Sequence, residues 1–569
     1  MATTIRKKYF QRALAVILLL IAVNIGAAYL HGRWDLTAEK RYTLSNSTVQ
    51  LLRGLDSPVE IEVYLKGDYP ASFKQLAQAT QELLEEFREY GRQNLRFTFV
   101  NPGQGLSDTA RMKFLGALTE KGIMPYNMKV QGDANDSYQE KLIFPGALVH
   151  YKGDTLGVNL LKNQGGQDPM QSMNASESLL EYQFASAISK LQEKEKPLVG
   201  YMLGHGESLG AEVYDALTTL QTNYSLDTLT LQGTAYIPKD FDVILFAKPA
   251  ETFSDADKFK IDQYVMNGGK VIWFIDETNA SFDSLQQKPS FLAFDKGLNL
   301  EDLLFRYGVR INQDLIQDLQ SDAVPMVVGN VGNRPQIIQL PFPLFPLLTP
   351  TGAHPIVKNL DLVLSHFVSS MDTVRTEGLK KTILLTSSRS TRAIRVPAEI
   401  SWEMLKTQPN PREYRQQHLA TAVLLEGQFT SLFRNRLDAK AAAEMEVASG
   451  TPYKANTDKA NAMIVVSDGD LIANAVSRKE GPLQMGINEY NPGYAFANKE
   501  FMLNCMEFLT GKHGIMESRN KEITLRLLDT EKVKKEKTKW QAICFILPIG
   551  MVLIFAMVFL FIRQRKFAE

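Results

Sequence analysis

The sequence predicts an α/β protein in which two transmembrane helices frame a large folded body. Residues 13–30 and 542–562 form two apolar runs, one close to each end of the 569-residue sequence. The chain is 44% hydrophobic and 22% charged, so the residues between the two runs can bury ordinary cores. From residue 197 onward, short apolar runs alternate with helical patterns, which is typical of a parallel sheet covered on both faces.

The first apolar run has the length of a membrane-spanning helix. As a helix, residues 13–30 would be about 27 Å long, close to the hydrocarbon thickness of a bilayer. No clear small-x-small cleavage site marks a mature start, so the run predicts an uncleaved anchor rather than a signal peptide. The second run, residues 542–562, predicts the second transmembrane helix.

The basic residues at both ends predict the topology. Residues 1–12 and 563–569 carry cations next to the apolar runs, which favours two cytoplasmic tails. The stem, residues 516–541, carries five lysines between 532 and 539 and argues for the opposite orientation. Long domains cross the membrane largely regardless of charge, so we expect a two-pass protein of the cytoplasmic (inner) membrane with its body in the periplasm.

The first domain, residues 31–192, is predicted to be thioredoxin-like. A strand at 58–65, an amphipathic helix and a strand at 95–100 are followed by two paired strands near 141–151 and 155–160. The domain contains no Cys-x-x-Cys motif, since the two cysteines of the chain are Cys505 and Cys544. Redox chemistry is therefore excluded, and the domain is expected to be a scaffold or a binding unit.

The second domain, residues 193–515, is predicted to contain a flavodoxin-like or amidotransferase-like parallel sheet. The expected strands are 197–203, 226–231, 242–247, 270–275 and 462–467, and the expected helices are 211–224, 254–265, 300–307 and 499–509. Residues 339–355 carry five prolines between apolar side chains and predict an extended apolar loop. Covering the core is favoured for this loop, and a docking surface is the alternative.

Several predicted strands end in polar residues, which predicts a ligand crevice at the carboxyl edge of the sheet. Such a crevice would suit a metal ion or a sugar, but helix caps and turns are the favoured explanation of these residues. The glycines that follow the first strand also allow phosphate binding with Asp227 as a ribose partner, but a tight turn is favoured. The candidate ligand-binding residues are Gly204, His205, Gly206, Glu207, Asp276, Glu277, Asp468 and Asp470.

No catalytic motif is present in the sequence. A Gly-x-Ser-x-Gly elbow, a His-Glu-x-x-His motif and a Walker A motif are all missing, and no cysteine follows an early strand. We therefore expect a protein that is not an enzyme and uses no cofactor. The net charge of +0 gives no indication of nucleic-acid binding.

The segment after the first apolar run is a candidate docking site for another membrane subunit, but a polar stalk is the explanation that physical reasoning alone favours. The candidate docking residues are Trp34, Asp35, Leu36, Lys40, Arg41 and Tyr42. The string at 35–45 resembles the gliding-motility-associated ABC transporter accessory protein, the GldG type, of Bacteroidetes. The resemblance continues at residues 204–207, 303–311, 343–348, 354–360, 467–474, 498–504, 523–529 and 540–541.

This resemblance implies a partnership rather than a reaction. Members of the family, often called substrate-binding, are thought to work with a multispanning permease and a cytoplasmic ATPase in an export-type system required for gliding. The expected function is thus a non-enzymatic accessory subunit. It would bind the permease through its membrane hairpin and a substrate, envelope partner or motility-machinery protein through its outer domains. The alternative is a membrane-tethered receptor or enzyme that uses the acidic crevice.

Overall fold

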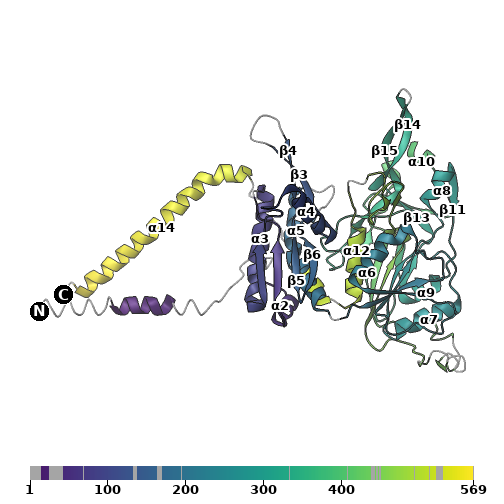
Figure 1. Ribbon diagram of the computed structural model, residues 1–569, viewed down its shortest axis with the longest axis horizontal. Coiled ribbons are helices and arrows are strands. Elements are labelled where there is room, and N and C mark those ends of the chain that lie inside the picture. Colours follow the sequence, from purple (N-terminus) through teal and green to yellow (C-terminus); the bar gives the residue numbers. More distant parts are fainter. Residues whose placement is uncertain are drawn as a thin grey trace. The chain divides into compact units, whose positions relative to one another are not determined.

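The computed structural model describes most of the chain. The described residues are 14–24, 43–520 and 530–567, except 68, 132–137, 163–168, 194, 332–333, 407, 437–442, 444–445, 448–449, 451, 492–493 and 512. The chain divides into two compact units, residues 1–521 and 522–569. The described part of the first unit contains two large sheets with their helices and four two-stranded sheets (Figure 1).

The first sheet has the strand order β2-β1-β5-β6. Strand β1 (Val59–Val63) runs parallel to β2 (Leu95–Phe99) and antiparallel to β5 (Gly146–Tyr151), which pairs with β6 (Asp154–Asn159). The buried positions of β1 alternate along the strand, so one face of the sheet meets the core. Its helices are α2 (Asn46–Arg53), α3 (Ala71–Gly91), α4 (Asp108–Glu120) and α5 (Pro169–Gln192).

The strand expected near 141–151 is in fact two strands. Strand β4 ends at Ile143 and pairs with β3 (Tyr126–Gln131) in a separate hairpin, whereas β5 begins at Gly146. Pro145 lies between them and has no N–H to donate to a ladder, so the chain leaves one sheet there and enters the other.

Five parallel strands form one end of the second sheet, in the order β8-β7-β9-β10-β22, with β8 at the edge. They are β8 (Ser225–Thr230), β7 (Leu198–Leu203), β9 (Val243–Ala247), β10 (Lys270–Phe274) and β22 (Asn461–Val466). All five match predicted strands, and every residue of β9 is buried. In sequence order the arrangement is 2-1-3-4-5, so the direction of winding reverses between β7 and β9.

The sheet is mixed rather than purely parallel. Strand β21 (Ala420–Gly427) pairs antiparallel with β22, and β18 (Leu379–Thr386), β15 (Arg334–Pro350) and β14 (Ser321–Val331) continue the antiparallel series. The first six residues of β21 are buried, so this strand is as apolar as its parallel neighbours. Apolar content alone therefore could not reveal that the strand direction changes here.

The predicted proline-rich loop, residues 339–355, is mostly a strand. Its residues up to Pro350 belong to β15, which forms a long hairpin with β14 (Figure 1). Prolines fit extended backbone, and the pairing is irregular at Ser321 and Ala323 opposite the proline-rich part. Phe342, Leu344 and Phe345 are buried, which agrees with the expected core-covering role.

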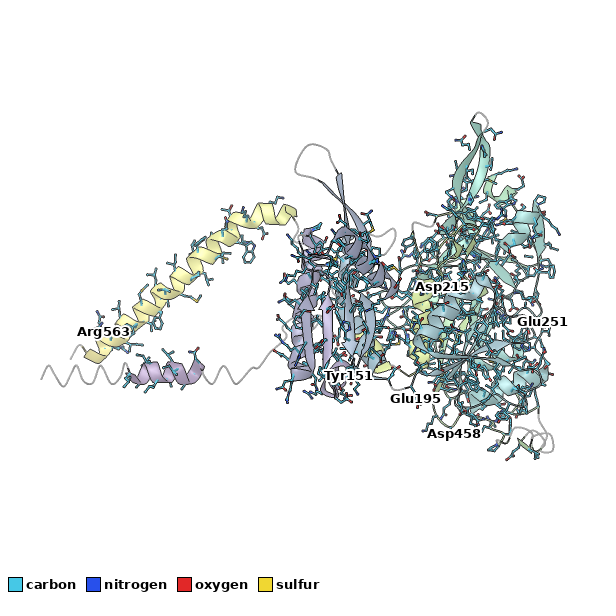
Figure 2. The ribbon with its side chains drawn as sticks, viewed as in Figure 1. Tyr151, Glu195, Asp215, Glu251, Asp458 and Arg563 are labelled. Carbon is cyan, nitrogen blue, oxygen red and sulfur yellow. The ribbon has the colours of Figure 1, made fainter. Side chains whose placement is uncertain are left out.

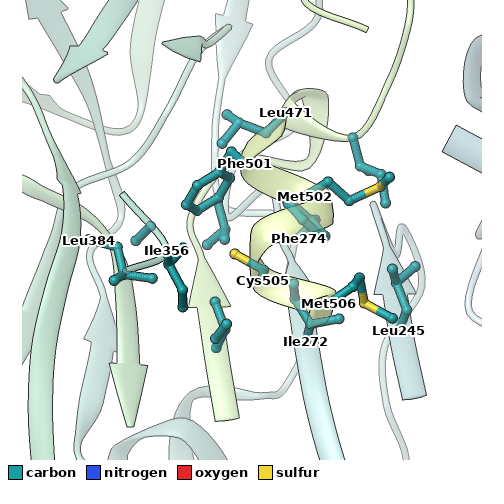
Figure 3. Packing of buried hydrophobic residues seen from close by; sticks show 14 of the residues in the cluster. Leu245, Ile272, Phe274, Ile356, Leu384, Leu471, Phe501, Met502, Cys505 and Met506 are labelled. Carbon is teal, nitrogen blue, oxygen red and sulfur yellow. The ribbon is translucent and has the colours of Figure 1, made fainter. Parts of the chain in front are cut away.

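Helices cover both faces of the second sheet. On one face, α6 (Tyr214–Asn223) and α12 (Asn498–Leu509) contribute to a single cluster with the strands. Figure 3 shows Met502 and Met506 of α12 beside Leu245, Ile272 and Phe274. On the other face lie α7 (Asp255–Met266) and α9 (Glu301–Tyr307). Ser254 caps α7, and Gly308 ends α9 in a left-handed conformation with φ of 99°, as the sequence predicts.

Shorter elements complete the second domain. They are α8 (Phe282–Gln287), β11 (Ser290–Ala293), β12 (Val309–Ile311), β13 (Asp314–Asp318), β16 (Val363–Leu364), β17 (Met371–Thr373), β19 (Thr391–Arg395), β20 (Ala398–Ser401), α10 (Glu403–Lys406), β23 (Val476–Ser477), β24 (Gly481–Pro482) and α13 (His513–Met516).

The second unit contains helix α14 (Thr530–Phe567). Its segment Lys535–Arg565 contains an 18-residue stretch with a mean hydropathy of 2.9 and can cross a membrane by length and composition. Figure 2 shows Arg563 near the C-terminal end of this helix. The predicted boundary between stem and span at residue 541 lies inside one continuous helix, because lysine and glutamate are good helix formers.

Only part of the first predicted span can be compared with the structure. Residues Leu14–Asn24 form an apolar helix, in which the Asn24 side chain donates a 2.9 Å hydrogen bond to the Leu20 carbonyl. The rest of the run, residues 25–30, lies outside the described residues. Among the described helices, only α14 is long enough and apolar enough to cross a bilayer, so the two-span hairpin stays a prediction.

Candidate functional site

A cavity of about 600 Å³ opens at the carboxyl ends of the parallel strands. Lys248, which follows β9, and Asp470, which follows β22, line it together with His366 from the loop after β16. In open α/β sheets, ligands bind in a crevice at this edge, where the winding reverses. The cavity is therefore the candidate functional site, at the place that the sequence predicts.

Three of the predicted acidic residues meet beside this cavity. Carboxylate oxygens of Asp276, Asp468 and Asp470 lie within 4.8 Å of one another. The Lys248 ammonium forms an ion pair with Asp470, and its Nζ lies 3.5 Å from Asp276 Oδ2. Lys296 adds a second cation, also 3.5 Å from Asp276 Oδ2. The group is thus a network of acidic and basic side chains rather than a purely acidic pocket.

Backbone N–H groups fix the acidic side chains in place. Asp468 is fully buried and accepts hydrogen bonds from the N–H groups of Asp470 and His366, at 2.7 and 2.9 Å. Asp276 accepts one from Gly469 N at 2.6 Å. The first of these bonds makes Asp468 the cap of the short helical turn that begins at Gly469, so the capping interpretation holds for this residue.

Burial and neighbouring charges separate the pKa values of these side chains. Burial, followed by the charges of Asp470 and Asp276, raises the pKa of Asp468 well above its ordinary value. Burial alone would raise the pKa of Asp470 as well, but the adjacent Lys248 and His366 hold it below its ordinary value. Asp470 lines the cavity and Asp468 does not, so Asp470 is the one of the two that can contact a polar ligand there.

His205 does not face this network. Its Nε2 lies 3.4 Å from Asp257 Oδ2, and its ring stacks on Phe253 with centroids 3.8 Å apart. The side chain is 2% exposed, and burial lowers its pKa. His205 is thus a core side chain that joins the strand to helix α7, and the expected convergence of an imidazole with the acids is wrong.

The glycine-rich loop after β7 is a tight turn. Gly204 and Gly206 have φ of 110° and 84°, and a Cβ on Gly206 would lie 2.9 Å from Ala250 Cβ. The His205 carbonyl accepts hydrogen bonds from Ala250 N and Glu251 N, which ties β7 to the loop after β9. Glu207 Oε2 accepts a bond from His205 N at 2.7 Å, and burial raises the pKa of this carboxyl group. These contacts favour the turn over phosphate binding.

Asp227 lies away from the cavity. It belongs to β8 and accepts a hydrogen bond from its own neighbour, Thr228 N, at 2.8 Å. The idea of a ribose partner at this position has no support from the geometry.

Glu277 belongs to a second acidic group. Its carboxylate lies within 4.8 Å of carboxylate oxygens of Asp295 and Glu301, whereas its neighbour Asp276 faces Lys248. Burial, followed by the charges of Glu301 and Asp295, raises the pKa of Glu277 to about 8. Consecutive residues on extended backbone point to opposite sides, so these two acids serve different surroundings.

Sequence reasoning missed the three basic partners of the acids, Lys248, Lys296 and His366. Lys248 directly follows a predicted strand, so the strand-end rule that selected the acids could have selected it too. Lys296 and His366 lie in long connections whose folding no local pattern reveals. The predicted docking residues Trp34, Asp35, Leu36, Lys40, Arg41 and Tyr42 lie outside the described residues.

Comparisons with solved structures give only low similarity. The N-terminal domain of mmIFT52 has a TM-score of 0.30 and 11% identity, over 55% of this chain and 97% of that chain. A putative ThuA-like protein from Parabacteroides merdae has a TM-score of 0.24 and 11% identity, over 59% and 94%. An exo-β-1,4-mannosidase from Opitutaceae bacterium strain TAV5 has a TM-score of 0.20 and 9% identity, over 81% and 52%. At these TM-scores none of them supports an assignment.

Comparisons of sequence are more informative. No curated protein matches the chain. Residues 38–150 match the model of a domain of unknown function, DUF7088. Residues 196–505 match the model of a family described as an ABC-type uncharacterized transport system, and this match contains the whole parallel sheet and the candidate site. Since it covers more than half of the 569 residues, the chain belongs to this family of auxiliary components of ABC-type transport systems.

Proposed function

We propose that the protein is a non-enzymatic, membrane-anchored accessory subunit of an ABC transporter that serves gliding motility, of the GldG type found in Bacteroidetes. Family membership supports the link to a transport system, and the resemblance of residues 35–45 supports the narrower assignment. A multispanning permease and a cytoplasmic ATPase are the proposed partners, and the docking segment around Trp34 and Tyr42 is a proposed contact with the permease.

The observation that carries the proposal is helix α14. A segment long and apolar enough to cross a membrane, within Lys535–Arg565, follows the folded body. Such a helix would hold the body at a membrane, which is where a subunit of an ABC transporter works. The order β2-β1-β5-β6, with its parallel pair and antiparallel hairpin, supports a thioredoxin-like first domain that serves as a binding unit.

Co-purification tests the partnership. The tagged full-length protein, extracted in a mild detergent, is expected to bring down the permease and the ATPase in fixed ratio. A matched variant carries Trp34→Ala and Tyr42→Ala, and it is expected to lose most of both partners while its own yield stays the same. If the wild-type protein elutes without either subunit, the proposal is wrong.

Cysteine labelling tests the proposed orientation, in which the body is periplasmic and both tails are cytoplasmic. Cys505 is fully buried and burial raises its thiol pKa, so it will not react, and Cys544 is first replaced by serine. With a membrane-impermeant maleimide, Met112→Cys, at a side chain that is 78% exposed, is expected to label in intact spheroplasts. Ala568→Cys is the control and should label only after lysis. The reverse pattern would place the body in the cytoplasm.

The cavity at the sheet edge favours a second candidate function, that of a membrane-tethered receptor for a small polar ligand. Its volume of about 600 Å³ falls within the range of ligand sites, and it presents both carboxylates and ammonium groups. A double variant, Lys248→Met with Asp470→Asn, removes one positive and one negative charge, so the net charge of the network does not change. If cells with normal levels of this variant still glide, the receptor function is ruled out.

A further inference from the structure

The second acidic group lies where two connections of the second domain pair with each other. Thr278 and Asp295 form an antiparallel bridge, and Lys296 N donates a 2.9 Å hydrogen bond to the Glu277 carbonyl. This pairing places Glu277, which follows β10, beside Asp295, which follows β11. Glu301, the first residue of α9, completes a group whose carboxylate oxygens lie within 4.8 Å of one another.

The carboxyl group of Glu277 is buried without a partner. The side chain is 7% exposed, and no described residue donates a hydrogen bond to it or forms an ion pair with it. Asp295 is fixed beside it by hydrogen bonds from Gln313 Nε2 at 2.7 Å and Gly297 N at 3.0 Å. A buried carboxyl group normally has hydrogen-bond or cationic partners, so the oxygens of Glu277 are open to a ligand.

The contrast with the neighbouring network is informative. There, Lys248 and Lys296 form ion pairs with Asp276, and Lys248 also pairs with Asp470. The cation nearest to Glu277 is Lys296, which already pairs with Asp276. The first group therefore contains its own counter-ions, whereas no described residue forms an ion pair with the three carboxyl groups of the second.

We propose that Glu277, Asp295 and Glu301 bind a calcium ion. Carboxylate oxygens are the ligands of hard divalent cations, and two oxygens on opposite sides of a calcium ion at about 2.4 Å are about 4.8 Å apart. One carboxylate oxygen of each of the three side chains lies within this separation of the other two. Magnesium demands strict octahedral geometry and gives up its waters reluctantly, so a site of three carboxyl groups favours calcium. Glu301 is exposed and gives the ion a path from solvent.

Calcium titration of the full-length protein in detergent, after treatment with a chelator, tests the site. Isothermal titration calorimetry with calcium chloride is expected to give one ion per chain with a dissociation constant of about 0.1–1 mM, as in extracellular calcium modules. Magnesium chloride should bind at least about tenfold more weakly. Saturating calcium should also raise the melting temperature of the body by about 2 °C, since an ion that binds only the folded state stabilises it.

Two variants assign the site. Glu277→Gln keeps the shape of the side chain and is expected to weaken calcium binding more than about tenfold, since one of three charged ligands is lost. Glu301→Gln changes an exposed side chain, cannot threaten folding, and should also weaken binding. Glu403→Gln, at an exposed acid paired with Lys406, is the matched control and should bind calcium like the wild type.

Absence of calcium binding in the wild type, or unchanged binding in both site variants, would overturn the proposal. Loss of binding in Asp470→Asn but not in Glu277→Gln would assign the ion to the other group and overturn it as well.

Discussion

Replacing Arg519 by methionine is expected to lower the free energy of unfolding of the body by about 3 kcal/mol. The Arg519 side chain is 1% exposed. Its guanidinium group contacts α12 of the second domain and α5 of the first domain. It donates hydrogen bonds to Asn504 Oδ1 at 2.8 Å and to Glu500 Oε1 at 3.2 Å, and it lies over the ring of Tyr182, 4.6 Å from the centroid.

The cost arises from the partners that remain. Glu500 and Lys162 form a 2.8 Å ion pair, and Lys190 pairs with Glu507 at 2.7 Å in the same junction between α5 and α12. Without Arg519, Glu500 Oε1, Asn504 Oδ1 and the Lys358 carbonyl each lose a charged donor, and methionine supplies no hydrogen bond in its place. Removing one member of a buried ion network leaves the other charged groups without a partner. The loss in the free energy of unfolding is therefore larger than for a surface ion pair.

Denaturant unfolding of the detergent-solubilised protein, followed by tryptophan fluorescence, measures this loss. The matched control is Arg436→Met, which removes a 2.7 Å ion pair with Asp302 from an arginine that is 49% exposed. That change should cost less than about 1 kcal/mol. Equal costs for the two variants would show that the junction between the domains contributes no more than a surface contact.

Replacing Trp273 by alanine is expected to destabilise the second domain by about 4 kcal/mol. The side chain is fully buried on β10, in the middle of the parallel strands. Its ring stacks on Phe246 with centroids 4.1 Å apart and meets the edge of Phe253 at 6.0 Å. Truncation would leave a cavity among aromatic rings that sit on adjacent strands and cannot collapse freely.

A phenylalanine at the same position separates the effect of volume from that of chemistry. The indole Nε1 has no acceptor among the described residues, so Trp273→Phe removes a donor that the fold does not satisfy. We expect this variant to lose less than about 1.5 kcal/mol in thermal or denaturant unfolding. If it loses as much as the alanine variant, packing volume is not the source of the stability.

The sequence predicts the parallel strands well because burial on both faces leaves a continuous apolar run in each. It does not predict the antiparallel half of the sheet. Strand β21 is as apolar as β22, and the direction of a strand depends on the path of the chain between strands rather than on its own residues. The long β15 was hidden by prolines, which are tolerated here because its pairing with β14 is irregular.

The candidate site was predicted in position but not in composition. Asp276, Asp468 and Asp470 come together because each follows a parallel strand. His205 and Glu277 also follow strands, yet both turn away, because neighbouring residues alternate between the two sides of the sheet edge. The two-residue period of extended backbone, applied to the strand ends, is enough to separate Asp276 from Glu277.

Helix α14 is longer than the bilayer that it can cross. Its 38 residues extend for about 57 Å, nearly twice the hydrocarbon thickness. When the apolar part crosses a bilayer, the lysine-rich first turns therefore lie outside the hydrocarbon, among the headgroups. Pro548 lies inside the apolar part and has no N–H for the helical hydrogen bond, so the helix can bend there. Such a bend lets the part inside the bilayer tilt without carrying the lysine-rich part with it.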